Sequence, residues 1–382
     1  MTTSTADLAA GASRSTDPAA EARDERLRRV SLIARLMRRP ELGAVAGLVL
    51  VTVFFGLTAN PAMFTLAGVM TVLSPAAQLG ILAIAAALLM IGGEFDLSIG
   101  SMIAFSGLVF GALIVVGDLP LLAAIVATFV FAGLMGAVNG QIVIRTRLPS
   151  FIVTLAFLFI LRGLSLVGLK WATGGSTQLR GIGDKAGQGV VRELFSGQAL
   201  EGLFAWLAQA NWIAKFPNGT PTVTGVPVGV LWFLAIAALA TYVLLRTRFG
   251  NWIFAAGGDP NAARNSGVPV NMVKTTLFVL TACAATLVAI LTVLDAGSTD
   301  ARRGFQKEFE AIIAAVIGGC LLTGGYGSAI GAFFGAIIFG MVSIGLTYTS
   351  FDSDWFQVFL GGMLLLAVLF NNFIRRKATG ER

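Results

Sequence analysis

Long apolar runs separated by short polar connections make up most of this 382-residue chain. An apolar run of about 20 residues is long enough to cross the hydrocarbon core of a bilayer as a helix. The pattern therefore predicts an all-α integral membrane protein with about ten transmembrane helices. The ten predicted spans are residues 42–57, 74–92, 100–116, 120–143, 151–169, 226–245, 275–294, 311–322, 329–346 and 355–370. A half-length apolar segment at 63–73 predicts a re-entrant or interfacial helix that leads into the second span.

Composition narrows the class of protein. Hydrophobic residues make up 56% of the chain and charged residues 12%, which excludes an ordinary soluble domain. There is no histidine, and the two cysteines, Cys283 and Cys320, lie inside apolar runs. Neither a metal site rich in histidine or cysteine nor a disulfide framework is therefore predicted. The net charge of +7 is assigned to basic loops beside anionic lipid, and no nucleic acid partner is expected.

Polar segments at the two ends of the chain are predicted to lie outside the membrane domain. Residues 1–40 predict a disordered and then amphipathic, arginine-rich cytoplasmic tail. Residues 41–376 form the predicted membrane domain, and 377–382 a cytoplasmic C-terminal tail. Lysine and arginine gather in the tails and in alternate loops, and this bias predicts that both termini are cytoplasmic.

Two segments are expected on the extracytoplasmic side. The long polar loop 171–225 contains an apolar patch at 200–212 that predicts a short surface helix. This loop either caps a pore, touches an outer partner, or is a tolerated insertion. The mixed-charge segment 296–310 predicts either a protein contact or a solvated face.

The loop 246–274, predicted to be cytoplasmic, contains the stretch FAAGGDPNAARNSGVPVNMVK. Asp259 is a typical helix N-cap, Pro260 suits the first helical position, and Gly267 suits the left-handed residue that ends a helix. A capped helix of about two turns is too short to be stable alone, so it is expected to dock on a soluble partner. The candidate docking residues are Gly258, Asp259, Pro260, Ala263, Arg264 and Gly267.

Few ionisable or polar groups fall within the predicted spans, and these are candidates for a transport pathway. Asp96 is expected either to line the pathway or to cap the helix that follows it. Arg162 either faces the interior or extends toward the outer surface, and Asn139 is also expected to join neighbouring helices. The candidate pathway residues are Glu94, Asp96, Ser98, Ser101, Asn139, Thr154 and Arg162.

Two glycine-rich stretches resemble one another. IGGEFDLSIGSMIAFSG at 91–107 and IGGCLLTGGYGSAIGAFFG at 317–335 each have a GG pair followed by a GS pair. Membrane transporters often contain internal repeats with broken helices at matching places. The likeness therefore predicts an internal repeat, with chance similarity as the alternative.

The sequence lacks the parts that would energise transport within the chain. It has no GxxxxGK[ST] motif for ATP, no series of buried acids or histidines typical of proton-driven carriers, and no histidine to serve as a general base. The chain is therefore not expected to be an enzyme or to bind a cofactor. Energy is expected to come from another chain.

Four stretches, taken in order, resemble the ribose/xylose/galactose-type permeases of ATP-binding cassette importers. They are LLMIGGEFDLSIGSMIAFSG, NGQIVIRTRLPSFIVTLAFLFILRGLSL, FAAGGDPNAARNSGVPVNMVK and AIIAAVIGGCLLTGGYGSAIGAFFGAII. The resemblance implies a homodimeric, multi-pass permease in a bacterial inner membrane. It also implies a cytoplasmic ATPase subunit, which holds ATP and Mg²⁺, and a periplasmic sugar-binding protein. The capped helix then corresponds to the coupling loop of the family, and the substrate to a neutral monosaccharide or related polyol.

The chain departs from the family pattern at one point, because family members more often read GGIDLS where this chain has GGEFDLS. This departure leaves the identity of the substrate open. A permease for branched-chain amino acids or nucleosides would share the same architecture. An ion-coupled secondary transporter is the alternative from a different class.

Overall fold

The computed structural model describes residues 40–352 and 354–379, and their side chains as far as residue 369. The predicted tail at 1–40 lies outside the described residues except for Pro40, which begins the first helix. In chain order the elements are α3 (Pro40–Thr58), η2 (Pro61–Phe64), α4 (Leu66–Ile91), α5 (Ile99–Val115), α6 (Leu121–Thr146), α7 (Ser150–Thr173), β1 (Gln178–Leu179), α8 (Ile182–Lys185), α9 (Val190–Glu193), β2 (Gln198–Ala199), α10 (Glu201–Gln209), β3 (Val226–Pro227), α11 (Val228–Arg246), α12 (Arg248–Gly258), α13 (Pro260–Asn265), α14 (Val270–Ala296), β4 (Thr299–Asp300), α15 (Lys307–Ile317), α16 (Ala329–Gly345), η3 (Leu346–Tyr348) and α17 (Trp355–Thr379).

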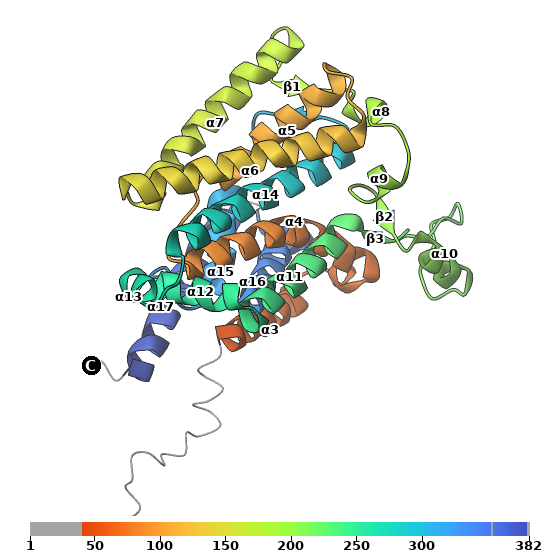
Figure 1. Ribbon diagram of the computed structural model, residues 1–382. Coiled ribbons are helices and arrows are strands. Elements are labelled where there is room, and N and C mark those ends of the chain that lie inside the picture. Colours follow the sequence, from red (N-terminus) through yellow and green to blue (C-terminus); the bar gives the residue numbers. More distant parts are fainter. Residues whose placement is uncertain (1–39, 353, 380–382) are drawn as a thin grey trace, which may run out of the picture. The chain divides into compact units, whose positions relative to one another are not determined.

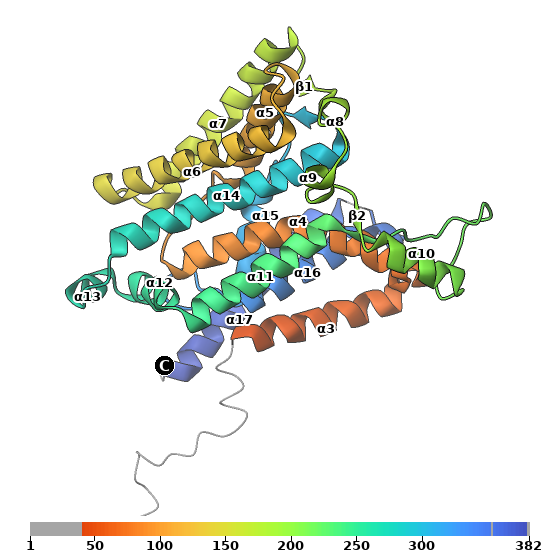
Figure 2. The ribbon, with the colours of Figure 1, turned by 45° about the vertical axis from the view of Figure 1, so that its right-hand side comes forward.

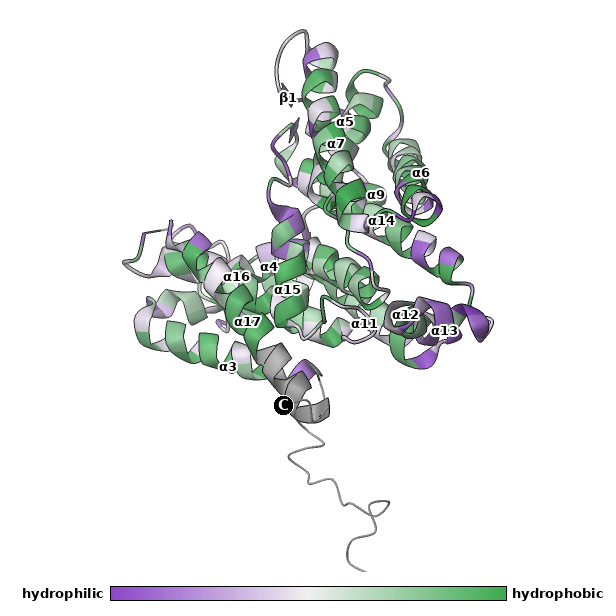
Figure 3. Ribbon diagram, turned by 90° about the vertical axis from the view of Figure 1, so that its left-hand side faces the viewer, coloured by the Kyte–Doolittle hydropathy of each residue, from purple (hydrophilic) through white to green (hydrophobic). Residues whose placement is uncertain are grey.

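Seven helices in the described part of the chain are long and apolar enough to cross a bilayer. They are α3, α4, α6, α7, α11, α14 and the helix formed by α16 with η3. Two shorter apolar helices, α5 and the first part of α17, accompany them. The predicted all-α integral membrane fold is confirmed. Hydrophobic residues dominate the helices, whereas hydrophilic residues gather on α13 and on the connections (Figure 3).

Three helices, α4, α14 and α16, form the centre of the fold. α4 packs against α11, α14, α15 and α16, and it lies between α14 and α16 in Figure 2. Its sequence is apolar on every face, as expected of a helix surrounded by other helices. Small residues allow close approach, since a Cβ built on Gly340 of α16 would lie only 2.9 Å from the carbonyl oxygen of Val72 in α4. α3, by contrast, is largely exposed.

The two ends of the bundle carry different elements (Figure 1). We call the end that carries α12 and α13 the α13 end, and the opposite end the β1 end. At the β1 end, β1 pairs with β4 in an antiparallel ladder, and β2 pairs with β3. The short surface helix predicted at 200–212 is present as α10, which buries Phe204 and Ala208 against Ile213 and Val223.

The separate half-length helix predicted at 63–73 is wrong. Only the single turn η2 stands apart, and α4 begins at Leu66 and continues without a break through Pro75. The Oγ1 atom of Thr65 accepts a hydrogen bond from the Gly68 amide at 3.2 Å and so caps this helix. The second span was predicted to begin at residue 74, next to Pro75. Proline is, however, tolerated inside transmembrane helices, where neighbouring groups satisfy the freed backbone.

The full span predicted at 311–322 is also wrong. α15 has 11 residues, a length of about 16 Å, which is roughly half of a hydrocarbon core about 30 Å thick. The segment 297–306 before it returns from the end of α14 to the middle of α7, where Arg162 binds its carbonyl groups. A connection that consists mostly of turns and a short helix together replace one long helix. Between α4 and α6, the non-helical segment 92–98 similarly precedes a helix, α5, which is longer at 17 residues.

The predicted internal repeat has a local structural counterpart. The amides of Gly92, Gly93 and Glu94 donate to the carbonyls of Leu88, Met90 and Leu89. In the same way, the amides of Gly318, Gly319 and Cys320 donate to Ala314, Val316 and Ala315. Gly93 and Gly319 have φ values of +83° and +89°, which glycine adopts without strain. α4 and α15 therefore end in the same turn, and each is followed by a connection, 92–98 or 318–328, that leads into the next helix.

Candidate functional site

The predicted docking helix is present as α13. Oδ1 of Asp259 accepts hydrogen bonds from the amides of Asn261 and Ala262 at 2.9 and 3.0 Å. Pro260 occupies the first helical position, and Gly267 follows the C-cap with φ +83°. These local predictions are confirmed. Ala263 is the buried residue of the helix, while the rest of its side chains are exposed or partly exposed, so α13 presents a polar surface.

A second short helix, α12, leads into α13 and was not predicted from the sequence. Oγ1 of Thr247 accepts from the Gly250 amide at 3.1 Å and caps the start of α12. Ile253 and Ala256 are buried and fix the helix to the bundle. Asp259 joins the two helices, because its amide donates to Ala255 at the end of α12 while its side chain caps α13. The cap residue and the apolar positions were visible signals of this helix.

Segment 92–98 is held along α7 by two side-chain acceptors. The Phe95 amide donates to Oγ of Ser150 at 3.0 Å, and the Leu97 amide donates to Oγ1 of Thr154 at 3.0 Å. Thr154 is fully buried. Extended backbone inside a bilayer must have its polar groups satisfied by the protein. In this conformation, Thr154 therefore secures the segment to α7.

Asp96 lies at the centre of a buried polar network. Its Oδ1 accepts from the amide of Ser98 at 2.8 Å and from the Ser98 hydroxyl at 2.5 Å. Its Oδ2 accepts from Oγ1 of Thr281 in α14 at 2.6 Å. Asn139 of α6 donates to Oγ of Ser98 at 3.1 Å, and Oγ of Ser101 donates to the Ser98 carbonyl at 2.8 Å. The network joins α5, α6 and α14, so Asn139 links helices as expected.

Glu94 forms an ion pair with Lys274 in the second turn of α14. The two side chains are only 11% and 14% exposed, so solvent screens this pair less than a surface pair. It fixes the start of segment 92–98 to the α13 end of α14. This pairing was not predicted, because Lys274 lies 180 residues from Glu94 along the chain.

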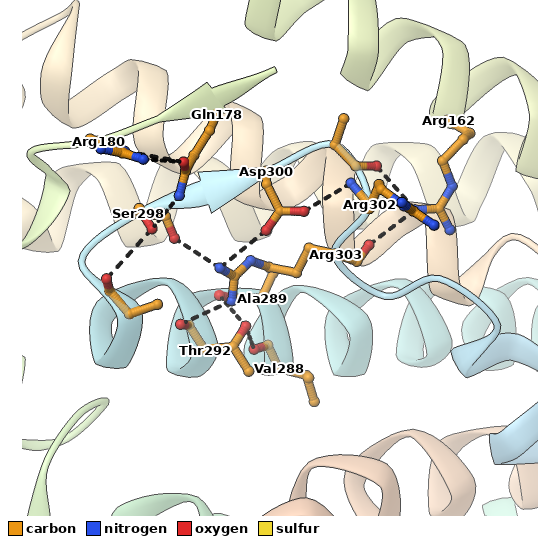
Figure 4. Close-up of polar contacts among 12 residues, drawn as sticks. Arg162, Gln178, Arg180, Val288, Ala289, Thr292, Ser298, Asp300, Arg302 and Arg303 are labelled. Atoms are coloured by element: carbon orange, nitrogen blue, oxygen red, sulfur yellow. Dashed lines mark hydrogen bonds and ion pairs between the residues drawn. The ribbon is translucent and has the colours of Figure 1, made fainter. Parts of the chain in front are cut away.

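Arg162 lies apart from the Asp96 network and binds the other connection, segment 297–306 (Figure 4). Its guanidinium donates to the carbonyl oxygens of Ala301 and Arg303 at 3.2 and 3.1 Å, and more weakly to that of Gly304 at 3.4 Å. A Cβ built on Gly100, at the start of α5, would lie 2.6 Å from the Gly304 carbonyl oxygen. The two connections therefore meet where α5 begins.

The segment 296–310, predicted to be either a protein contact or a solvated face, is only partly exposed. Arg303 donates to the carbonyls of Thr292 and Ser298 at 3.1 and 3.0 Å and pairs with Asp300, as Figure 4 shows. Glu308 and Glu310 are 4% and 8% exposed. Arg303, Glu308 and Glu310 therefore lie within the fold, whereas Arg302 is exposed.

Four buried side-chain polar atoms have no hydrogen-bond partner among the described residues. They are Oδ1 of Asn139, Oγ1 of Thr299, Nε of Arg303 and Oε2 of Glu308. Buried polar atoms are usually hydrogen-bonded, so at each of these atoms the described part of the chain leaves one hydrogen bond unmade. Glu308 was not among the predicted pathway residues. No cluster of three or more acidic or cysteine side chains suited to a metal ion occurs within the described residues.

Comparisons with known proteins identify the family. Residues 68–368 match the family described as "Branched-chain amino acid transport system / permease component". The chain is 32% identical over 346 residues to the ribose import permease protein of Escherichia coli strain K12, which covers 90% of this chain and 97% of that protein. It is 29% identical to the xylose transport system permease protein of the same strain, over 87% of this chain and 92% of that protein. It is 28% identical to the fructose import permease protein of Rhizobium meliloti, over 87% and 85% of the two chains. The chain therefore belongs to this family of membrane permease components, which are transport subunits and not enzymes.

Proposed function

We propose that this chain is the membrane-spanning subunit of an ATP-binding cassette importer that moves a neutral monosaccharide across a bacterial inner membrane. The observation that carries this proposal is similarity along nearly the whole chain to permeases named for ribose, xylose and fructose import. The capped, exposed helix α13 supports it, since an importer whose permease lacks an ATP site needs a docking surface for its ATPase.

The α13 end is assigned to the cytoplasm. α13 is flanked by Arg246 and Arg248 on one side and Lys274 on the other, and basic residues favour the cytoplasmic side of a membrane. The start of α3 and the end of α17 also lie at the α13 end (Figures 1 and 2). Both termini are then cytoplasmic, and the loop 171–225 faces the periplasm.

Three protein partners follow from this assignment. A cytoplasmic ATPase subunit holds ATP and Mg²⁺ and docks on α13 through the predicted residues Gly258, Asp259, Pro260, Ala263, Arg264 and Gly267. A periplasmic sugar-binding protein delivers substrate at the β1 end. A second copy of the permease completes a homodimer within the lipid bilayer.

The ionisable groups predicted within the spans are engaged by the protein itself. Glu94 is paired with Lys274, Asp96 accepts hydrogen bonds at both oxygens, and Arg162 binds backbone carbonyls. An anionic or cationic substrate would need a free charge of opposite sign. A sugar instead brings hydroxyl donors, which suit unpaired acceptors such as Oδ1 of Asn139. These contacts favour a neutral polyol.

Six of the seven predicted pathway residues are buried in this conformation, whereas Arg162 is partly exposed. Measured over the whole residue, the exposed fraction is at most 8% for each of Glu94, Asp96, Ser98, Ser101, Asn139 and Thr154. They hold segment 92–98 against α6, α7 and α14. Contact between them and a sugar would require the segment to move away from these helices, and we propose that this movement opens the pathway during transport.

Docking on α13 is tested by two substitutions. Asp259→Ala removes a cap worth roughly 0.5–2 kcal/mol, and Arg264→Glu reverses the charge on the exposed face. We expect both variants to insert normally into the membrane but to retain less ATPase on purification and to lose uptake. Arg180→Glu, an exposed arginine at the β1 end, is the matched control. Full ATPase recovery with Arg264→Glu would contradict docking through this face.

A further inference from the structure

Four glycines from three distant parts of the chain meet at the α13 end. They are Gly93 after α4, Gly257 near the end of α12, and Gly324 and Gly325 in the connection between α15 and α16. We call these four residues the glycine junction. The Gly325 amide donates to the Ile91 carbonyl, the last residue of α4, at 2.9 Å. The junction therefore joins the start of connection 92–98 and the later part of connection 318–328 to α12, the helix that leads into α13.

The contacts at the junction are made by backbone atoms. A Cβ built on Gly257 would lie closer than 3.0 Å to the Ile91 carbonyl oxygen, and 2.8 Å from the Gly325 amide nitrogen. A Cβ on Gly324 would lie 2.7 Å from the Gly257 carbonyl oxygen and 2.8 Å from the Gly93 Cα. A Cβ on the neighbouring Gly258, in contrast, meets nothing within 4 Å. The close approach is thus specific to one face of α12.

Backbone contact transmits movement more directly than side-chain contact does. A long side chain between two elements can absorb a displacement by changing rotamer, whereas close-packed backbone has no such freedom. α13 is joined to α12 through Asp259 alone, which ends one helix and caps the other. A displacement of α13 is therefore expected to displace Gly257 as well.

Beyond the junction, the chain leads to the buried network described above. Within segment 92–98, Gly93 belongs to the junction and Asp96 to the buried network. Glu94, between them, pairs with Lys274 in α14. Segment 318–328 leads from α15, whose first turn carries the buried Glu308, into α16. Connections 92–98 and 318–328 thus both contact the end of α12.

We propose that the glycine junction passes the movement of the docked ATPase from α13 to segments 92–98 and 318–328, and that Gly257 is the positioning residue in this step. The inference rests on the proposed docking of the ATPase on α13. It adds the route by which docking of the ATPase affects the membrane interior. This route requires that residue 257 have no side chain.

The variant Gly257→Ala tests this route in the complete importer. We expect ATPase recovery and basal ATP hydrolysis close to those of the wild type. Sugar moved per ATP hydrolysed should fall about ten-fold or more, because overpacking at a close contact is enough to shift a two-state equilibrium by that factor. The control is Gly229→Ala in the first turn of α11, where an added Cβ meets nothing within 4 Å. Unchanged coupling in Gly257→Ala would overturn the proposal.

A second measurement uses the unmodified chain, in case Gly257→Ala does not fold. Hydrogen–deuterium exchange is compared for the permease alone and for its complex with the ATPase and a non-hydrolysable ATP analogue. Docking predicts protection of α13, and the junction predicts a simultaneous change in peptides covering 92–98 and 318–328. Protection of α13 without any change in these segments would refute the junction alone. No protection of α13 would instead refute the docking on which it rests.

Discussion

Replacing Arg162 with glutamine removes a guanidinium that holds segment 297–306 against α7. The structure gives it two well-formed hydrogen bonds, to the carbonyls of Ala301 and Arg303 at 3.2 and 3.1 Å. A hydrogen bond to a charged group contributes roughly 1.5–3 kcal/mol. The glutamine amide can restore one of the two, so we expect the free energy of unfolding to fall by about 2 kcal/mol. A loss of this size lowers the ratio of folded to unfolded protein roughly 30-fold.

The assay is a denaturant titration of purified permease in mixed micelles, followed by tryptophan fluorescence. Arg302→Gln is the matched control, because Arg302 is an exposed neighbour whose side chain stacks on Phe305. We expect this control to change stability by less than about 0.5 kcal/mol. Arg162→Lys, which keeps the charge but not the planar fork, should fall between wild type and Arg162→Gln.

The contacts of Arg162 also predict which properties of the Arg162→Gln variant are retained. Arg162→Gln should reduce folding and expression more than it alters which substrate is moved, because the guanidinium faces backbone carbonyls and not an open pathway. Normal stability together with selective loss of uptake of a carboxylated compound would refute both this assignment and the neutral-sugar proposal.

Two further predictions address orientation and the buried ion pair. A topology reporter fused after Arg382 should read cytoplasmic and one inserted within 181–197 should read periplasmic; a periplasmic signal at the C-terminus would contradict the assignment of the α13 end. Glu94→Gln or Lys274→Gln alone should cost roughly 3–5 kcal/mol by leaving one buried charge unpaired, whereas the double variant should be more stable than either single one in the same titration. Strictly additive losses would show that Glu94 and Lys274 do not interact.

The parts of the fold that could be predicted are those set by local sequence. Asp259, Pro260 and Gly267 specify α13 through contacts within a few residues of one another, so the cap, the first turn and the end of the helix were all predicted. Most spans were found because about 20 consecutive apolar residues have few alternatives to a transmembrane helix.

The parts that could not be predicted depend on contacts between distant residues. Segment 297–306 is polar in sequence, and its contacts with Arg162 of α7 and with Gly100 of α5 show that it folds back into the bundle. No feature of the sequence around Lys274 indicates that it pairs with Glu94. The glycines at 257 and 325 were visible in the sequence, but glycine marks close approach without naming its partner.

The central claim, that this chain moves a neutral monosaccharide with energy from a separate ATPase, is tested most directly in reconstituted vesicles. Uptake of labelled D-ribose, D-xylose and D-fructose is measured with the permease, its ATPase and its binding protein, alongside L-leucine and uridine. The account predicts uptake of at least one of the sugars that requires ATP and both partners and that persists when ion gradients are collapsed. Uptake of leucine or uridine in place of every sugar, or sugar uptake driven by an ion gradient without the ATPase, would contradict it.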